Sequence, residues 1–207
     1  MRVMLDCRAC RMARAGTSLL CGALAITMLF PAVAGGCSEL RKAPSANLMR
    51  YLQGNGSSLK VECVAYAISR LGKERYVPAA EVLTRYLDFK VIPQRLGNSP
   101  VPISRIPWHD EYPAMEALVE IGFPAVSALT KAIAEGFGTS VALDNAIETL
   151  LAIYKGGPNE AIKRLIEAQA AGAARADRLR QAAALSVGRC PLEFRKRCEN
   201  ALAESKR

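Results

Sequence analysis

This sequence of 207 residues has few of the side chains on which enzyme mechanisms depend. It contains a single histidine, His109, so a Ser/His/Asp or Cys/His mechanism would have to use that residue as its base. No Gly-x-Ser-x-Gly elbow accompanies His109, and Gly54-Asn55-Gly56 has no lysine placed as in a phosphate-binding loop. The composition therefore predicts a protein with no catalytic residue and no cofactor.

Metal-binding residues are equally sparse. His109 is followed by Asp110 and Glu111, but three adjacent residues on one loop rarely converge on a single ion. The simpler interpretation is an exposed histidine beside two acids that favour the positive end of the next helix. Cys190 and Cys198 lack the close spacing of zinc ligands and have no histidine nearby. We therefore expect no metal site.

The chain begins with the features of an export signal. Four arginines precede an apolar run, Leu19 to Phe30, which is followed by the small residues Ala32-Val33-Ala34. The run is shorter than the roughly 20 residues that a spanning helix needs, which favours a cleaved signal at 1–34 over an uncut anchor or a buried helix. We interpret Met12 as the true start, because Arg2 to Arg11 make the basic region long.

Four of the seven cysteines follow this signal. Cys63 lies beside an apolar stripe and is expected to be a small core residue. Cys190 and Cys198 are candidates for a disulfide in an oxidising compartment. Cys37 stands in Ala34-Gly35-Gly36-Cys37-Ser38, which resembles a bacterial lipobox although Ala34 occupies the position where leucine is usual. Cys37 is therefore a candidate for lipid attachment.

Residues 35–46 are expected to form a tether, and residues 47–207 a helical domain. Its clearest unit is Ser58 to Leu87, which contains two apolar stripes with helical spacing. One runs from Val61 to Leu71 and the other from Ala79 to Leu87. Between them, Gly72 is expected to end the first helix in the left-handed conformation and Pro78 to open the second.

The same frame recurs along the chain, with Gly122 before Pro124 and Gly157 before Pro158. It resembles the short HEAT-like repeats of phycobilin lyases and of many exported bacterial proteins, through Ala65, Ala67, Leu71, Gly72, Val77, Pro78 and Leu83. The resemblance covers about residues 57–203. It implies an all-α fold, a right-handed α-solenoid of antiparallel helix pairs, and carries over no catalytic residue.

A proline-rich loop, residues 89–111, interrupts the repeats. Its four prolines exclude a helix of useful length, and loops of this size in compact domains are often functional. Apolar and aromatic side chains on or beside it are candidates for partner contact, namely Ile106, Trp108, His109 and Tyr112. The alternative is that Trp108 folds back and covers the hydrophobic core.

The positive charge is concentrated at the C-terminal end, where residues 173–207 hold nine lysine and arginine residues against four acids. The candidate basic patch consists of Arg178, Arg180, Arg195, Lys196 and Arg197. Such a surface attracts anionic lipid, an acidic partner or nucleic acid. The alternative is the polar outer face of a terminal capping repeat.

Together these features predict an exported, non-catalytic protein-interaction scaffold, either free in the periplasm or held on a membrane through Cys37. The partner is expected to be another protein. The alternative is a cytoplasmic HEAT-like protein that binds nucleic acid through its basic C-terminal helices. An enzyme-accessory factor of the phycobilin lyase kind has less support.

Overall fold

The computed structural model describes residues 37–54, 59–91, 111–168 and 172–204, all of which belong to the unit Gly35–Arg207. These residues form helices and contain no strand, so the fold is all-helical. The α-helices are α1 (Ser38–Lys42), α2 (Ser45–Gln53), α3 (Val61–Lys73), α4 (Ala80–Leu83), α6 (Pro113–Ile121), α7 (Val126–Glu135), α8 (Ser140–Ile153), α9 (Pro158–Glu167), α10 (Ala173–Arg189) and α11 (Arg195–Glu204). Short 3-10 turns join several of them, namely η2 (Val77–Ala79), η3 (Thr84–Tyr86), η4 (Phe123–Ala125) and η5 (Leu192–Phe194).

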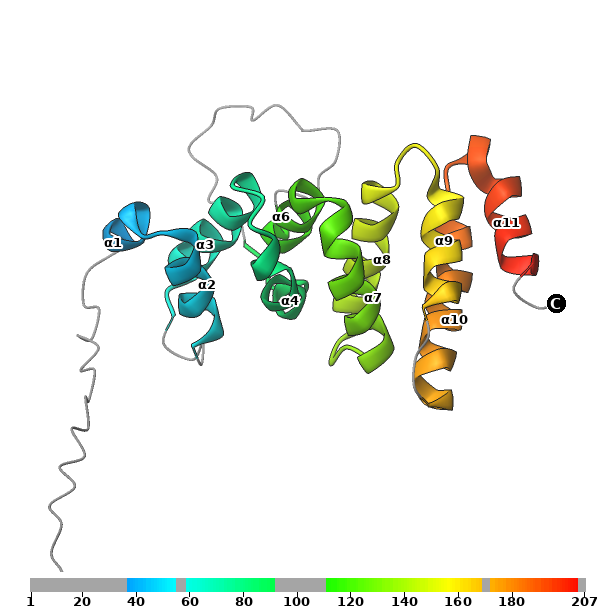
Figure 1. Cartoon of the computed structure of the whole chain (residues 1–207), viewed down its shortest axis with the longest axis horizontal. Coiled ribbons are helices and arrows are strands. Elements are labelled where there is room, and N and C mark those ends of the chain that lie inside the picture. The colour runs from blue at the N-terminus through cyan, green and yellow to red at the C-terminus, as the bar shows by residue number, and fades with distance from the viewer. Residues whose placement is uncertain (1–36, 55–58, 92–110, 169–171, 205–207) are drawn as a thin grey trace, which may run out of the picture. The chain divides into compact units, whose positions relative to one another are not determined.

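The helices of this unit contact one another in a regular succession (Figure 1). Helix α3 packs against α6, α6 against α8, and α8 against α10. The intervening helices form further contacts, α2 with α4, α4 with α7, and α9 with α11. Helix α7 contacts both α8 and α10, and this second contact departs from a strict succession of neighbouring pairs.

The core is built from the apolar stripes that the sequence indicates. Val64, Ile68 and Leu71 of α3 are buried, as are the apolar residues from Ala79 to Leu87. Val61, expected at the start of the first stripe, is instead 52% exposed and is the first residue of α3. Burial of the apolar face, rather than intrinsic propensity, supplies most of the stability of such short helices.

Gly72 corrects one prediction about the helix ends. It lies inside α3 and is buried, and the left-handed conformation falls on Arg75, with φ 48°. A Cβ at Gly72 would lie 2.4 Å from the Cα of Ala117 on α6. Glycine is therefore required here by the close approach of two helices and not by the end of α3.

The prolines open helical segments as predicted. Pro113 and Pro158 occupy the first positions of α6 and α9, where the missing N–H costs no hydrogen bond. Pro78 and Pro124 lie in the 3-10 turns η2 and η4, which lead directly into α4 and α7. Gly122, just before Pro124, has φ 76°, so this glycine does provide the positive φ at the end of α6.

The segment expected to be a tether differs most from expectation. Residues 38–42 form α1, and Cys37, directly before it, forms a disulfide with Cys63 of α3. Arg70 of α3 donates hydrogen bonds to the carbonyl oxygens of Leu40 and Arg41 at 3.0 and 2.8 Å. The chain is thus fastened to the fold from Cys37 onward, through a long-range pairing that local composition does not indicate.

Within the described ranges, no single helix is long and apolar enough to cross a bilayer. The bent pair Pro113–Ile121 and Phe123–Glu135 reaches that composition only jointly, across a bend of 112°. Most of the apolar side chains of this pair are buried in the core.

Candidate functional site

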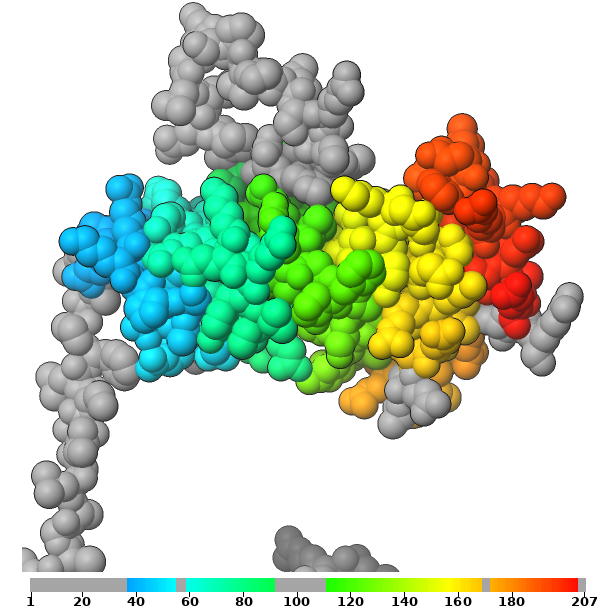
Figure 2. All heavy atoms as spheres, turned by 45° about the horizontal axis from the view of Figure 1, so that its top comes forward, coloured from blue at the N-terminus to red at the C-terminus, as the bar shows by residue number. Residues whose placement is uncertain are grey.

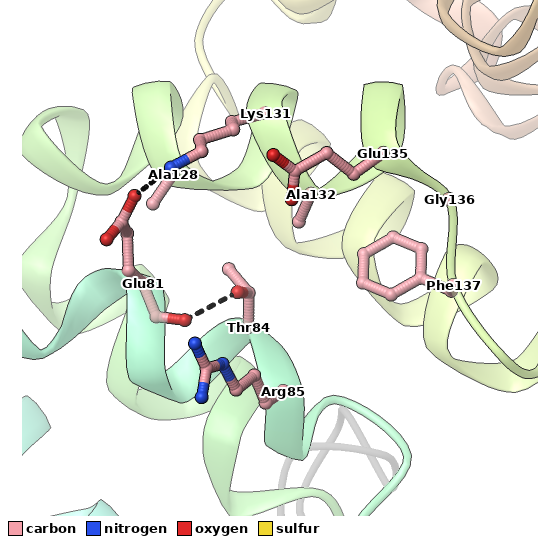
Figure 3. Close-up of a pocket in the computed structure, with 9 residues that line it drawn as sticks. All are labelled: Glu81, Thr84, Arg85, Ala128, Lys131, Ala132, Glu135, Gly136 and Phe137. Carbon is pink, nitrogen blue, oxygen red and sulfur yellow. Dashed lines mark hydrogen bonds and ion pairs between the residues drawn. The ribbon is translucent and has the colours of Figure 1, made fainter. Parts of the chain in front are cut away.

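Two hollows in the surface flank helix α7. The first, of about 190 Å³, lies between α7 and the α4–η3 segment (Figure 3). The second, of about 510 Å³, lies between α7 and helices α9 and α10. Lys131 and Glu135 of α7 line both hollows and so join them into one surface. We call this surface the α7 face, and its charged residues are Glu81, Arg85, Lys131, Glu135, Arg164, Glu167 and Arg175.

The hollows exist because α7 carries small side chains where it borders them. Ala128 and Ala132 line the first hollow, and Ser127 and Ala134 line the second. The larger apolar residues of α7 are buried in the core, namely Val126, Leu129 and Ile133. In the space-filling view, α7 is exposed between the α4 segment on one side and α9 on the other (Figure 2).

One ion pair crosses the first hollow. The Nζ atom of Lys131 lies 2.5 Å from Oε1 of Glu81. The hydrogen bond from Lys131 lowers the pKa of the Glu81 carboxyl and raises the pKa of the Lys131 ammonium. Both side chains are more than half exposed, so the pair contributes little to folding. Its charges remain available to a partner.

Arg85 lies on the opposite side of the same hollow. Figure 3 shows its guanidinium on the far side from Lys131, with the ring of Phe137 at one end. This side chain is exposed and forms no hydrogen bond with any residue of the described ranges. Thr84, next to it, is buried, and its Oγ1 donates to the carbonyl oxygen of Glu81 at 2.8 Å. Arg85 thus extends from an ordered turn, and its guanidinium forms no hydrogen bond that stabilises this turn.

The second hollow has a similar distribution of charge. Arg164 and Glu167 come from α9 and Arg175 comes from α10, and all three are exposed. Neither arginine forms a side-chain hydrogen bond or ion pair with another described residue. Leu179, which is 2% exposed, provides an apolar contribution to the lining.

Arg178, in contrast, forms a hydrogen bond that stabilises the end of α7. Its Nε donates to the carbonyl oxygen of Ala134 at 2.8 Å, in the last turn of α7. Its side chain also lies against Gly136, where a Cβ would be 3.3 Å from the Arg178 Cδ and where φ is 90°. Arg178 therefore caps the C-terminal end of α7 and neutralises its partial negative charge.

The candidate contact residues on the loop are only partly placed. Ile106, Trp108 and His109 lie outside the described residues. Tyr112 is half-buried against the core, with the Nζ of Lys90 5.9 Å from its ring centroid. Lys90 also forms an ion pair with Glu111 at 2.8 Å. Tyr112 is thus held in the packed junction at the start of α6.

The five residues of the candidate basic patch have different environments. Arg178 donates a hydrogen bond to the last turn of α7, and Arg180 forms an ion pair with Asp177 at 2.9 Å. Arg195, Lys196 and Arg197 form the exposed first turn of α11, where the Arg197 guanidinium lies 5.9 Å from the ring of Phe194. Only the group on α11 therefore presents adjacent, exposed positive charges.

All four cysteines that follow residue 34 form disulfides. Cys190 joins Cys198 across the turn that precedes α11, and Cys37 joins Cys63. Cys63 is buried as expected, but it is not the free core residue that its position suggested. Its neighbours in sequence gave no indication of a partner 26 residues away.

The α7 face offers guanidinium, ammonium and carboxylate groups that can form hydrogen bonds and ion pairs. The described ranges contain no group of three His, Cys, Asp or Glu residues close enough to hold a metal ion. The sequence did not predict this face, since an alanine on a helix indicates only that the side chain is small. That Arg85 and Arg164 have no hydrogen-bonding partner among the described residues follows only from the folded structure. No family model, no curated protein and no solved structure matches the chain.

Proposed function

We propose that this chain is an exported, non-catalytic protein-interaction module, and that it binds its partner through the α7 face. The observation that carries the proposal is the pair of open hollows on either side of α7, whose lining includes three arginines that form no side-chain hydrogen bond or ion pair within the described ranges. Enclosed pockets suit small ligands, whereas a shallow surface spread over α4, α7, α9 and α10 suits another polypeptide.

The proposed architecture is a right-handed α-solenoid of HEAT-like helix pairs. The stepwise contacts α3–α6, α6–α8 and α8–α10 support it, because in a solenoid each repeat packs mainly on its neighbours. The recurrent proline at the start of α6 and α9 and in η2 and η4 supports it as well. Solenoids of this kind bind partners through extended surfaces that several repeats build together.

Export is supported by the disulfides. Structural disulfides persist in oxidising compartments such as the bacterial periplasm and are rare in the cytosol. Both disulfides here involve cysteines that follow the export signal proposed at 1–34. They also bear on membrane attachment, since a Cys37 sulfur bonded to Cys63 has no valence left for a thioether-linked lipid. A soluble periplasmic protein is therefore favoured over a lipoprotein.

The export proposal is tested on the protein recovered from its native host. Intact-mass spectrometry should find a chain that starts at Gly35, and maleimide labelling should modify no thiol before reduction and four after it. Recovery from the cytosol with residues 1–34 intact and seven reactive thiols would overturn the proposal and favour the nucleic-acid-binding alternative.

The binding proposal is tested by photo-crosslinking in the host envelope. A photoreactive amino acid replaces Ser127, which is exposed beside the second hollow, or Glu116, which is exposed on α6 and lies on neither hollow. We expect one crosslinked protein adduct at position 127 and none at position 116. Equal adducts at the two positions, or none at either, would remove the α7 face as the binding surface.

A further inference from the structure

We infer that the α7 face binds an extended, acidic polypeptide segment that crosses helix α7 and places carboxylates against Arg85, Arg164 and Arg175. This inference rests on the proposed function and narrows the partner to one chemical class. It follows from three observations, which concern the arginines, the glutamates between them, and the shape of the surface.

The three arginines are donors without acceptors. Arg85 extends from η3, Arg164 from α9 and Arg175 from α10, and none of them forms a side-chain hydrogen bond within the described ranges. Arg70 and Arg178, in contrast, bind carbonyl or carboxylate oxygens, whereas Arg41, Arg75 and Arg195 form no side-chain hydrogen bond within the described ranges either. A guanidinium presents a planar set of donors that matches a carboxylate in two parallel hydrogen bonds. Three such groups around one helix therefore favour a ligand with several carboxylates.

The glutamates exclude a uniform polyanion. Glu81, Glu135 and Glu167 lie among the basic residues, and Glu81 is already paired with Lys131. A nucleic acid strand or an anionic membrane would bring phosphates against these carboxylates as well as against the arginines. A polypeptide can place its acidic side chains individually at the arginines and put neutral or basic side chains opposite the glutamates.

The shape of the surface favours an extended segment. The two hollows lie on opposite sides of α7 and share Lys131 and Glu135. Because α7 carries Ala128 and Ala132 beside one hollow and Ala134 beside the other, a backbone can approach the helix closely as it crosses. Side chains on either side of the crossing point would then enter the two hollows. A single small anion in one hollow would leave at least one of the three arginines without an acceptor.

The test is selection of binding peptides on the mature chain, using a phage-displayed library of random 12-residue peptides. We compare the parent with R85Q/R164Q/R175Q and with the matched control R195Q/K196Q/R197Q, which removes an equal charge from the exposed first turn of α11. Enriched peptides should contain an excess of Asp and Glu over the input library. Their affinity, measured by fluorescence anisotropy with synthetic copies, should fall about tenfold or more in the first variant and less than about twofold in the control.

Several results would overturn the inference. It fails if no peptide is enriched, if enriched peptides carry no acidic excess, or if both triple variants lose affinity equally. It also fails if a 20-nucleotide single-stranded DNA or vesicles containing phosphatidylglycerol bind through these arginines and peptides do not. An adduct at position 127 with a partner segment free of acids would keep the proposed function and remove only this inference. Absence of both adduct and peptides would remove both.

Discussion

Helices α3 and α7 belong to the same helical unit but differ in how closely the neighbouring elements pack against them. Helix α3 lies so close to α6 that no Cβ fits at Gly72, and its Arg70 is occupied by the carbonyl oxygens of α1 and by Glu74. Around α7, small side chains border two open hollows, and Arg85 and Arg164 have no hydrogen-bonding partner among the described residues. The difference is what the proposed division of roles requires, in which the N-terminal helices stabilise the fold and the α7 face binds a partner.

The largest effect should come from breaking the close contact of α3. We expect Gly72→Ala to lower the free energy of unfolding by about 3 kcal/mol or more, because the added methyl meets the backbone of Ala117 and not a flexible side chain. The control is Gly188→Ala, where a Cβ would meet no atom within 4 Å and a helical alanine should add about 0.5 kcal/mol. Urea denaturation measures both. Equal stability of the two variants would contradict the close packing.

The next effect concerns the disulfide between Cys37 and Cys63. We expect C37S/C63S to lose about 2 to 3 kcal/mol, since a link across 26 residues restricts the unfolded chain. C190S/C198S, with a separation of 8 residues, should lose less. Thermal unfolding monitored by circular dichroism measures both losses, and a larger loss in C190S/C198S would contradict the assignment of the N-terminal end as the more strongly fastened one.

Replacing Arg70 or Arg175 by glutamine should change stability to different extents. Arg70→Gln should cost about 1 to 2 kcal/mol, because it removes hydrogen bonds to Leu40 and Arg41 and an ion pair with Glu74. Arg175→Gln on the α7 face should cost less than about 0.5 kcal/mol. Chemical denaturation of the two variants in one buffer measures the difference. If Arg175→Gln cost as much as Arg70→Gln, the Arg175 side chain would be making a stabilising contact, which would contradict its assignment to a free binding surface.

A smaller effect is expected from pH at Glu148 of α8. Burial raises the pKa of this carboxyl, and Asp144 raises it further, while Arg189 opposes the shift. Because the folded pKa lies above the unfolded one, Glu148 contributes stability below its ordinary pKa, and this contribution is lost as pH rises through the folded value. Glu148→Gln should therefore flatten the decline in stability above the ordinary glutamate range, by less than about 1 kcal/mol since the side chain is 45% exposed. Stability measured from pH 4 to pH 8 in parent and variant tests this, and a steeper decline in the variant would contradict it.

The all-helical fold could be predicted because its signals are local. The stripe from Val64 to Leu71 and the prolines Pro113 and Pro158 mark helices within a few residues of themselves. The structural role of Gly72 could not be predicted from local sequence, since it depends on Ala117, a residue of another helix that the fold brings into contact with it. A glycine near the end of an apolar stripe fits both a helix end and a close helix contact.

The candidate site was harder to predict for the same reason. Arg85 and Arg70 look alike in the sequence, and only the folded chain distinguishes the one that meets carbonyl oxygens from the one that meets none. The pairing of Cys37 with Cys63 likewise depends on α1 lying against α3. The aromatic loop residues that sequence reasoning favoured, Trp108 among them, lie outside the described ranges, and binding through them stays a prediction.

The most direct test of the division between α3 and the α7 face is the free energy of unfolding of R85Q/R164Q/R175Q, measured by urea denaturation beside the parent. We expect a value within about 0.5 kcal/mol of the parent, because these guanidinium groups make no hydrogen bond within the described ranges that folding would have to form. A loss of about 2 kcal/mol or more would show that the arginines stabilise the fold, and would contradict the claim that the α7 face is reserved for a partner.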